Sequence, residues 1–135
     1  MEAEVHHILG QRYEANVRGH RVQCDQPVAQ GGDDRGMPPP ELLLSALGCC
    51  AMHYATEYLR ARNLPLEGMN VRVTGEKGGR PARITEIAIT VEASGLEPDQ
   101  RQGLIRAVDS CLLHKTFLNP PDFKIESTVL APVCV

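Results

Sequence analysis

The sequence predicts an α+β fold in which antiparallel sheet wraps a buried central helix, and three observations support this prediction. The stretch from Pro39 or Pro40 to between Arg60 and Asn63 has the composition of a long helix that is apolar on every side. Shorter stretches on both sides of it alternate apolar and polar residues, as half-buried strands do. The strands come in groups and do not alternate one by one with helices, which favours antiparallel sheet.

Length and composition limit the class of protein. The chain has 135 residues, which fits a single domain over residues 1–135 with a core that needs no disulfide bonds. A formal net charge of −3, without a basic cluster among aromatic residues, argues against a nucleic-acid partner. The N-terminus is polar and acidic, so we expect no signal peptide and a cytoplasmic location. In that reducing compartment the five cysteines are expected to be thiols, ligands or redox groups, not structural bridges.

The first 25 residues contain three short segments, separated by Gly10 and by Arg18-Gly19. Alternation in the second and third segments predicts strands that are joined by a hairpin turn at Arg18-Gly19. Residues 26–40 are rich in glycine, aspartate and proline, which is typical of a loop. This loop runs into the long helix and is expected to shape a site there.

The long helix is the centre of the predicted fold. Prolines precede Glu41, and both residue types suit a first helical turn. A helix without a polar face is buried all round, while its length and its small residues argue against a membrane span. One chain of this size is not expected to cover it on every side, so we predict a homodimer. One face carries Leu43, Leu47, Cys50, Tyr54 and Tyr58, and the other carries Ser45, Ala46, Cys49 and Met52.

The rest of the chain reads as two strands, a helix and a strand. Strands are predicted over 69–74 and 83–93 with a polar loop over 75–81, and a shift between Ile84 and Ile87 indicates a bulge. A helix follows the turn at 95–99 and ends near His114-Lys115. A last strand is predicted over 123–131. The apolar stripe of this second helix is Leu104, Ile105, Val108, Cys111 and Leu112.

Cys50 and Cys111 are the first candidates for a functional site. Each lies on the inward stripe of its own predicted helix, so both thiols are expected to face a common core. Two interpretations stay open, a redox pair or two cysteines that pack as small hydrophobic residues. Cys49 points about 100° away from Cys50, so only one of them faces Cys111, and the stripe favours Cys50. Cys24 and Cys134 are expected to be incidental.

The segment Cys111-Leu-Leu-His114 has the spacing of half a zinc site, but the sequence offers no second pair of ligands at such a spacing. We therefore expect no metal and no cofactor. His114 and Lys115 are expected to end the second helix, where cations suit the helix dipole. If either of them lies beside Cys111, it would instead favour the thiolate form of that residue.

Two charged residues near the helix start are further candidates. Glu41 is a candidate catalytic carboxylate, and helix electrostatics alone is the competing explanation of its position. Nine residues of straight helix separate it from Cys50 by about 13 Å along the axis, so contact needs another element or a second chain. Arg35 in the preceding loop is the other candidate. It or Arg18 in the hairpin turn could fold over the helix start, and simple solvation is the competing explanation of both.

Three blocks of the sequence form a recognisable set in this order and spacing. They are Gly31-Gly32-Asp33, Pro39-Pro-Glu-Leu-Leu-Leu-Ser-Ala-Leu-Gly-Cys-Cys50 and Ser110-Cys-Leu-Leu-His-Lys-Thr116. With these blocks the sequence resembles the osmotically inducible protein C and organic hydroperoxide resistance (OsmC/Ohr) family. Asp25 before the glycine loop also fits, and with the element order the resemblance spans nearly the whole chain. It is closest to the OsmC-like members that have Pro-x-Glu-Leu-Leu-Leu before the cysteine.

The resemblance implies an intertwined homodimer and a peroxiredoxin-like thiol peroxidase without metal or flavin. By this analogy Cys50 attacks an organic hydroperoxide, Cys111 resolves the product to a disulfide, and a dithiol, a lipoyl protein in better-known members, restores both thiols. The family's catalytic glutamate position, counted back from Cys50, holds Pro40 here, and Glu41 comes one residue later. The alternative is a non-enzymatic dimer of this family that senses redox state or binds a small molecule.

Overall fold

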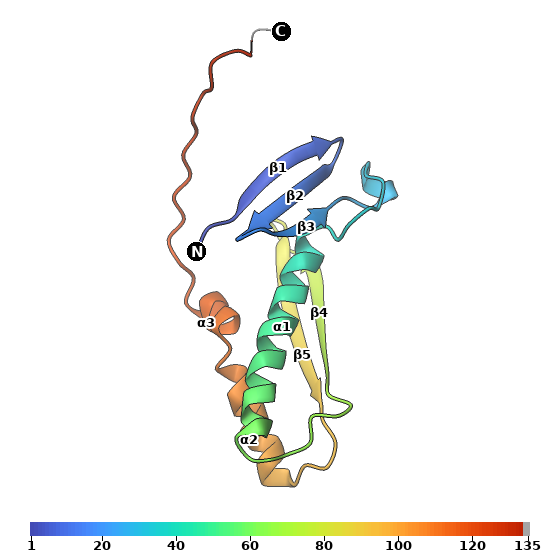
Figure 1. Cartoon of the computed structure of the whole chain (residues 1–135), viewed down its shortest axis with the longest axis vertical. Helices are drawn as coiled ribbons and strands as arrows, with labels where there is room; N and C mark the ends of the chain where they lie inside the picture. The colour runs from blue at the N-terminus through green and yellow to red at the C-terminus, as the bar shows by residue number, and fades with distance from the viewer. Residues whose placement is uncertain (134–135) are drawn as a thin grey trace.

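The computed structural model describes residues 1–133, so Cys134 lies outside the described residues. One three-stranded antiparallel sheet has the order β1-β2-β3, and a second sheet pairs β4 with β5. Helix α1 runs between the β4–β5 pair and the α2–α3 segment (Figure 1), which is the predicted α+β class. The elements are β1 (Glu4–Leu9), β2 (Arg12–Val17), β3 (His20–Cys24), the short 3₁₀ helix η1 (Val28–Gln30), α1 (Pro39–Arg60), β4 (Asn70–Gly78), β5 (Arg83–Glu92), α2 (Pro98–Asp109) and α3 (Leu112–Leu118).

The three-stranded sheet lies at the N-terminal end of α1 (Figure 1). Arg18 and Gly19 join β2 to β3 with φ angles of 53° and 82°. A two-residue hairpin needs positive φ at both turn positions, so the predicted turn is confirmed. Every residue of β1 is exposed, including Val5 at 62% and Leu9 at 65%, so this sheet is open to solvent in the single chain.

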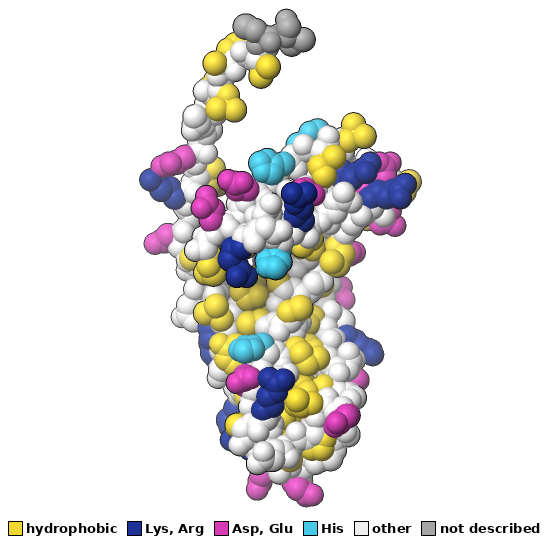
Figure 2. All heavy atoms as spheres, in the orientation of Figure 1, with side chains coloured by type: hydrophobic (Ala, Val, Ile, Leu, Met, Phe, Trp, Pro, Cys, Tyr) yellow, Lys and Arg dark blue, Asp and Glu magenta, His cyan; other side chains and the backbone are white. Residues whose placement is uncertain are grey.

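Helix α1 begins at Pro39 and ends at Arg60, as the sequence predicted. Its inward face recurs every four residues, and small side chains at two of those positions let neighbouring elements approach closely. The opposite face is not covered by the same chain: Cys49 and His53 are exposed, and hydrophobic side chains gather along the middle of the face seen in Figure 2. The prediction of burial on every side is therefore not met within one chain. The inward residues are Leu47, Ala51, Ala55 and Leu59, which pack with Leu104 and Val108.

The second sheet corrects one predicted boundary. Strand β4 continues to Gly78, because the backbone from Gly75 to Gly78 pairs with β5 instead of forming a loop. Glycine at position 75 also gives α1 room, since a Cβ there would lie 3.1 Å from Leu44 Cδ2. The bulge is confirmed: Glu76 pairs with Glu86 and Lys77 with Ile84, which leaves Thr85 as the extra residue.

The predicted second helix is two helices. Helix α2 ends at Asp109 and α3 begins at Leu112, because Cys111 between them has φ −52° and ψ 130°, outside the helical range. The apolar stripe therefore does not continue unbroken, and Leu112 is 61% exposed.

The predicted last strand does not pair in the single chain. Residues 120–133 have no strand partner and run away from the body as an extended segment (Figure 1). A strand requires a hydrogen-bonding neighbour, and none of the described strands lies beside this segment. Its large apolar residues are exposed as a result, Phe123 at 86%, Ile125 at 93% and Val129 at 94%.

Candidate functional site

The structure brings the two candidate cysteines together. Cys50 lies in the middle of α1, and Cys111 lies directly before α3, which contacts α1. The Cys50 side chain lies close enough to the Cys111 thiol to raise the pKa of that thiol. Cys111 has no exposed surface, and Cys50 is half-buried. The two thiols of the candidate pair are therefore neighbours in the folded chain.

The surroundings of Cys111 favour its neutral thiol. Burial raises the pKa of the Cys111 thiol above its usual value, and the adjacent Cys50 thiol raises it further. The backbone amides of His114 and Leu113 act in the opposite direction but do not outweigh burial. Cys111 consequently needs a base to become a good nucleophile at neutral pH.

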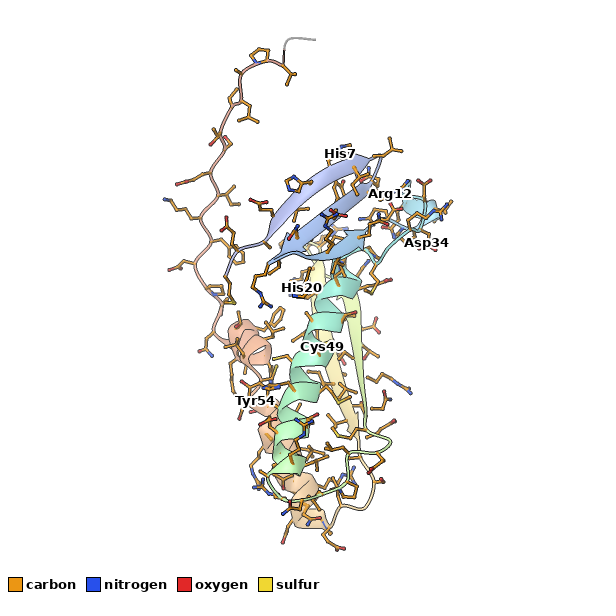
Figure 3. All side chains as sticks on the ribbon, viewed as in Figure 1. His7, Arg12, His20, Asp34, Cys49 and Tyr54 are labelled. Atoms are coloured by element: carbon orange, nitrogen blue, oxygen red, sulfur yellow. The ribbon has the colours of Figure 1, made fainter. Side chains whose placement is uncertain are left out.

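Cys49 lies on the other side of the helix, as the 100° rotation between neighbours requires. Its side chain is exposed on the outer face of α1 (Figure 3). It lines an open hollow of about 700 Å³ together with Ser45, Met52 and His53. The structure therefore pairs Cys50, and not Cys49, with Cys111.

An apolar cavity of about 540 Å³ lies on the inner side of α1, between β5 and the α2–α3 segment. It adjoins the cysteine pair, because Leu47 stands one turn before Cys50 and Val108 and His114 flank Cys111. Glu86 and Asp109 are carboxylates in its wall. A mostly apolar cavity with a few polar groups suits a small organic ligand. The remaining apolar lining consists of Ile84, Ile87, Ile89, Ile105, Phe117 and Leu118.

A charged cluster stands where α2 gives way to α3. Asp109 Oδ1 lies 3.3 Å from His114 Nδ1, and Lys115 Nζ donates a hydrogen bond of 3.0 Å to Asp109 Oδ2. The pKa of Asp109 is held below its usual value by the hydrogen bond and the charge of Lys115, against a smaller effect of burial, and His114 adds to the lowering. The carboxylate is thus ionised at neutral pH and fixed by two side chains. Asp109 lies outside the apolar stripe predicted for this part of the chain, and nothing in the sequence connected it with His114.

The loop before α1 is organised by Asp25, which is 1% exposed. Its carboxylate accepts hydrogen bonds from the backbone N–H groups of Gln26, Asp33 and Arg35 at 2.8, 3.2 and 3.0 Å. Burial alone would raise the pKa of Asp25, but these three donors and the charge of Arg12 outweigh it and lower the pKa. Asp25 therefore links the end of β3 to the loop that leads into the helix.

Glu41 and Arg35 stand apart from the thiol pair within one chain. Glu41 is exposed in the first turn of α1, and the Arg35 side chain is exposed in the loop. Among residues 1–133, neither of them contributes to the pKa shift of Cys111. A catalytic role for either residue stays a prediction that depends on a second chain.

Arg12 is a residue that the sequence analysis missed. It lies on β2 with its guanidinium 3.2 Å from Asp33 Oδ2, near the loop that carries Asp34 (Figure 3). Its Nε is buried and lacks a hydrogen-bond partner among the described residues. The alternation of β2 places it on the same face as Glu14 and Asn16, which read as an ordinary solvent face in the sequence.

Residues 1–133 lack two features, a metal-binding cluster and a membrane-spanning helix. No three His, Cys, Asp or Glu side chains there come together in a way that would hold a metal ion. No helix in that range combines the length and the apolar character that crossing a membrane requires.

Solved structures share the fold. A Psychrobacter arcticus 273-4 protein named for osmotic stress induction and detoxification response is 20% identical, with a TM-score of 0.77, over 84% of this chain and 85% of that one. An OsmC-like protein from Mycoplasma pneumoniae is 19% identical, with a TM-score of 0.70, over 89% of each chain. An organic hydroperoxide resistance protein OsmC from Legionella pneumophila is 14% identical, with a TM-score of 0.63, over 86% of this chain and 87% of that one.

The family comparison agrees with the fold. No curated protein sequence matches the chain. The family model of the OsmC-like proteins matches residues 31–126, which include the glycine loop, all of α1, both strands of the second sheet and both cysteines of the pair. The chain therefore belongs to the OsmC-like family.

Proposed function

We propose that this protein is a cysteine-based reductase of organic hydroperoxides. The observation that carries the proposal is the contact between the Cys50 and Cys111 side chains, next to an apolar cavity. The Legionella pneumophila structure, which shares the fold, is an organic hydroperoxide resistance protein, and the same chemistry is proposed here.

The proposed cycle has three balanced steps. The Cys50 thiolate attacks the O–O bond of the hydroperoxide, which releases the alcohol and leaves a sulfenic acid on Cys50. The Cys111 thiol displaces hydroxide from that sulfur, so a disulfide forms and water leaves. A dithiol, such as a lipoyl group on a protein, then exchanges with the disulfide and restores both thiols.

The cavity supports organic over inorganic peroxide as the substrate. Its isoleucine, leucine and phenylalanine side chains favour an alkyl or aryl group, since burying apolar surface contributes about 25 cal/mol per Å². Hydrogen peroxide has no such group to bury.

A test compares turnover of cumene hydroperoxide with a dithiol reductant in the wild type and in three serine variants. Cys50→Ser is expected to lower turnover by at least about 100-fold, because the attacking sulfur is absent. Cys111→Ser should accumulate a Cys50 sulfenic acid that dimedone traps. Cys49→Ser is the matched control, since its thiol lies on the opposite face, and it should keep wild-type turnover.

Mass spectrometry after one equivalent of peroxide should show a Cys50–Cys111 link. Equal turnover in the wild type and all three variants would contradict the proposal. A Cys49 adduct in place of that link would mean that the wrong thiol was assigned.

The proposed assembly is a homodimer, and members of the family are commonly dimers. Three exposed features of the single chain support it. The β1–β3 sheet is open, the outer face of α1 carries apolar side chains around Cys49, and residues 120–133 form an extended apolar segment without a neighbour. In a dimer, the tail of one chain adds a strand to a sheet of the other.

A second candidate is a non-enzymatic dimer that binds a small molecule. The observation that favours it is the distance of Arg35 and Glu41 from the thiol pair within one chain, which leaves the cavity as the main feature of the site. If peroxide leaves both thiols reduced while an apolar ligand such as cumyl alcohol raises the melting temperature, this second candidate replaces the first.

A further inference from the structure

The resolving step of the proposed cycle leaves one chemical requirement unmet. Cys111 must lose its proton as its sulfur attacks Cys50, and the hydroxide that leaves Cys50 must gain one. Burial favours the neutral thiol of Cys111, and water reaches it poorly because it has no exposed surface. A nearby group that moves a proton would satisfy both needs.

The candidate group is the imidazole of His114. Cys111 is the residue that caps α3, and His114 is the third residue of that helix. A side chain at this position lies near the capping residue, which is the geometry that lets Glu or Gln reach back in a capping box. The backbone amide of His114 already acts on the Cys111 sulfur, so the two residues are spatial neighbours.

The ring is held in a defined orientation. Asp109 Oδ1 lies 3.3 Å from His114 Nδ1, and Lys115 fixes the other carboxylate oxygen at 3.0 Å. A carboxylate on Nδ1 keeps the proton there and leaves Nε2 as the acceptor. The His114 side chain is 35% exposed and lines the apolar cavity, so it faces the space that the proposed substrate would occupy.

We infer that His114 is the proton-transfer residue of the resolving step and that Asp109 is the residue that positions it. This inference rests on the proposed reductase function. His114 Nε2 takes the Cys111 proton, directly or through one water, as the Cys111–Cys50 sulfur bond forms and the Cys50–oxygen bond breaks. The same imidazolium then gives its proton to the departing hydroxide, so water leaves and His114 returns to its neutral form. The oxidant is the Cys50 sulfenic acid that the hydroperoxide has already produced.

The test separates the two oxidation steps. In a Cys111→Ser background, trapping with dimedone measures how fast peroxide oxidises Cys50. In the intact chain, acid quenching and alkylation of the remaining thiols measure how fast the disulfide forms. Each rate is compared between the wild type, His114→Gln and Asp109→Asn, from pH 6 to pH 10. Glu67→Gln is the control, because Glu67 is exposed in the turn after α1 and lines neither the apolar cavity nor the hollow around Cys49.

At pH 7, His114→Gln should slow disulfide formation by about 100-fold, which is within the usual contribution of a positioned acid–base group, and should leave Cys50 oxidation unchanged within about twofold. The difference in the rate of disulfide formation between the wild type and His114→Gln should become smaller as the pH rises toward the range in which Cys111 ionises unaided. Asp109→Asn should slow the same step by about tenfold, because the ring loses its orientation but keeps its nitrogen. Glu67→Gln should match the wild type at every pH.

The charged and titratable groups around the ring are Asp109 from α2, Lys115 from α3, Glu86 from β5, Cys50 from α1, and Cys111 between α2 and α3. Glu86→Gln therefore accompanies the series, and it should leave the pH dependence of the wild type in place.

Three results would overturn the inference. The first is an equal rate of disulfide formation in the wild type and His114→Gln. The second is a slowing of disulfide formation in His114→Gln that is the same at every pH. The third is an equal slowing of Cys50 oxidation in that variant. A wild type that forms no sulfenic acid and no disulfide would instead remove the proposed function, and the inference with it.

Discussion

A single buried carboxylate, Asp25, holds together the loop that feeds the central helix. Three backbone N–H groups converge on it, and two of them come from residues eight and ten positions further along the chain. Charged acceptors make the stronger hydrogen bonds, and a buried one that loses its donors is costly. The identity of this residue therefore controls the order of the loop and the start of α1.

Replacing Asp25 by Asn is expected to lower the melting temperature at neutral pH, because a neutral amide accepts these three donors more weakly. Since the pKa of Asp25 is lowered in the folded state, its stabilisation is present above the unfolded value of about 3.9 and is lost as the pH falls through the lower folded pKa. The difference in melting temperature between the wild type and Asp25→Asn should thus be largest near pH 7 and should become smaller below about pH 4.

Thermal unfolding from pH 3 to pH 7 checks this prediction, with Asp34→Asn as the control in the same loop because its side chain is exposed. A gap that stays constant over the whole range would show that the charge of Asp25 does not stabilise the fold.

At the level of single residues, the sequence predicted one half of the candidate site. It selected Cys50 and Cys111 because both lie on inward stripes, which is a pattern that spacing reveals. It did not connect Asp109 with His114, since the break at Cys111 turns α3 and changes which face each residue presents. No glycine or proline marks that break, so local propensity gave no signal.

Among the elements, α1 depends on small residues at its closest contacts. Ala51 and Ala55 have no exposed surface, and Leu59 fills the next position of the same stripe. Interiors are packed at the density of organic crystals, so such a stripe tolerates neither extra nor missing volume.

Ala55→Leu and Leu59→Ala should both destabilise the protein, for opposite reasons. Extra methyl groups at position 55 force strain of about 1–3 kcal/mol, and the cavity left at position 59 costs about 2–5 kcal/mol. Denaturant unfolding measures both, with the exposed neighbour Arg60→Ala as the control. A change below about 0.5 kcal/mol for either core variant would argue against this packing.

The elements that the sequence predicted best are those whose pattern is local. The start of α1, the Arg18-Gly19 turn and the bulge at Thr85 all follow from short-range chemistry. The end of β4 did not, because three glycines between 75 and 79 suggested a loop while cross-strand pairing extends the strand through most of them. The last strand was not found either, since no described strand pairs with residues 120–133.

For the whole molecule, the extended tail is the feature that most requires a second copy. Phe123, Ile125 and Val129 fall on one side of an extended chain, with the polar Ser127 between the last two. An isolated segment of this kind has nothing to bury and no strand to pair with.

Ile125→Asn is expected to weaken dimerisation by at least about tenfold. Burying an isoleucine is worth about 1.5–3 kcal/mol, and each 1.4 kcal/mol is a factor of ten in Kd. Thr128→Asn, on the opposite side of the segment, should keep the wild-type Kd within about twofold. Sedimentation over a dilution series checks both, and a wild type that stays monomeric at micromolar concentration would contradict the assembly.

The contact between the Cys50 and Cys111 thiols has a consequence for how other proteins could detect the oxidation of this one. Because the Cys50 and Cys111 side chains are neighbours before any oxidant arrives, the proposed disulfide would join groups that already interact and would not need distant segments to meet. A signalling protein that recognised shape would then find little difference between the two states. Information about peroxide would then leave this molecule as electrons handed to a reductant, not as a conformational message.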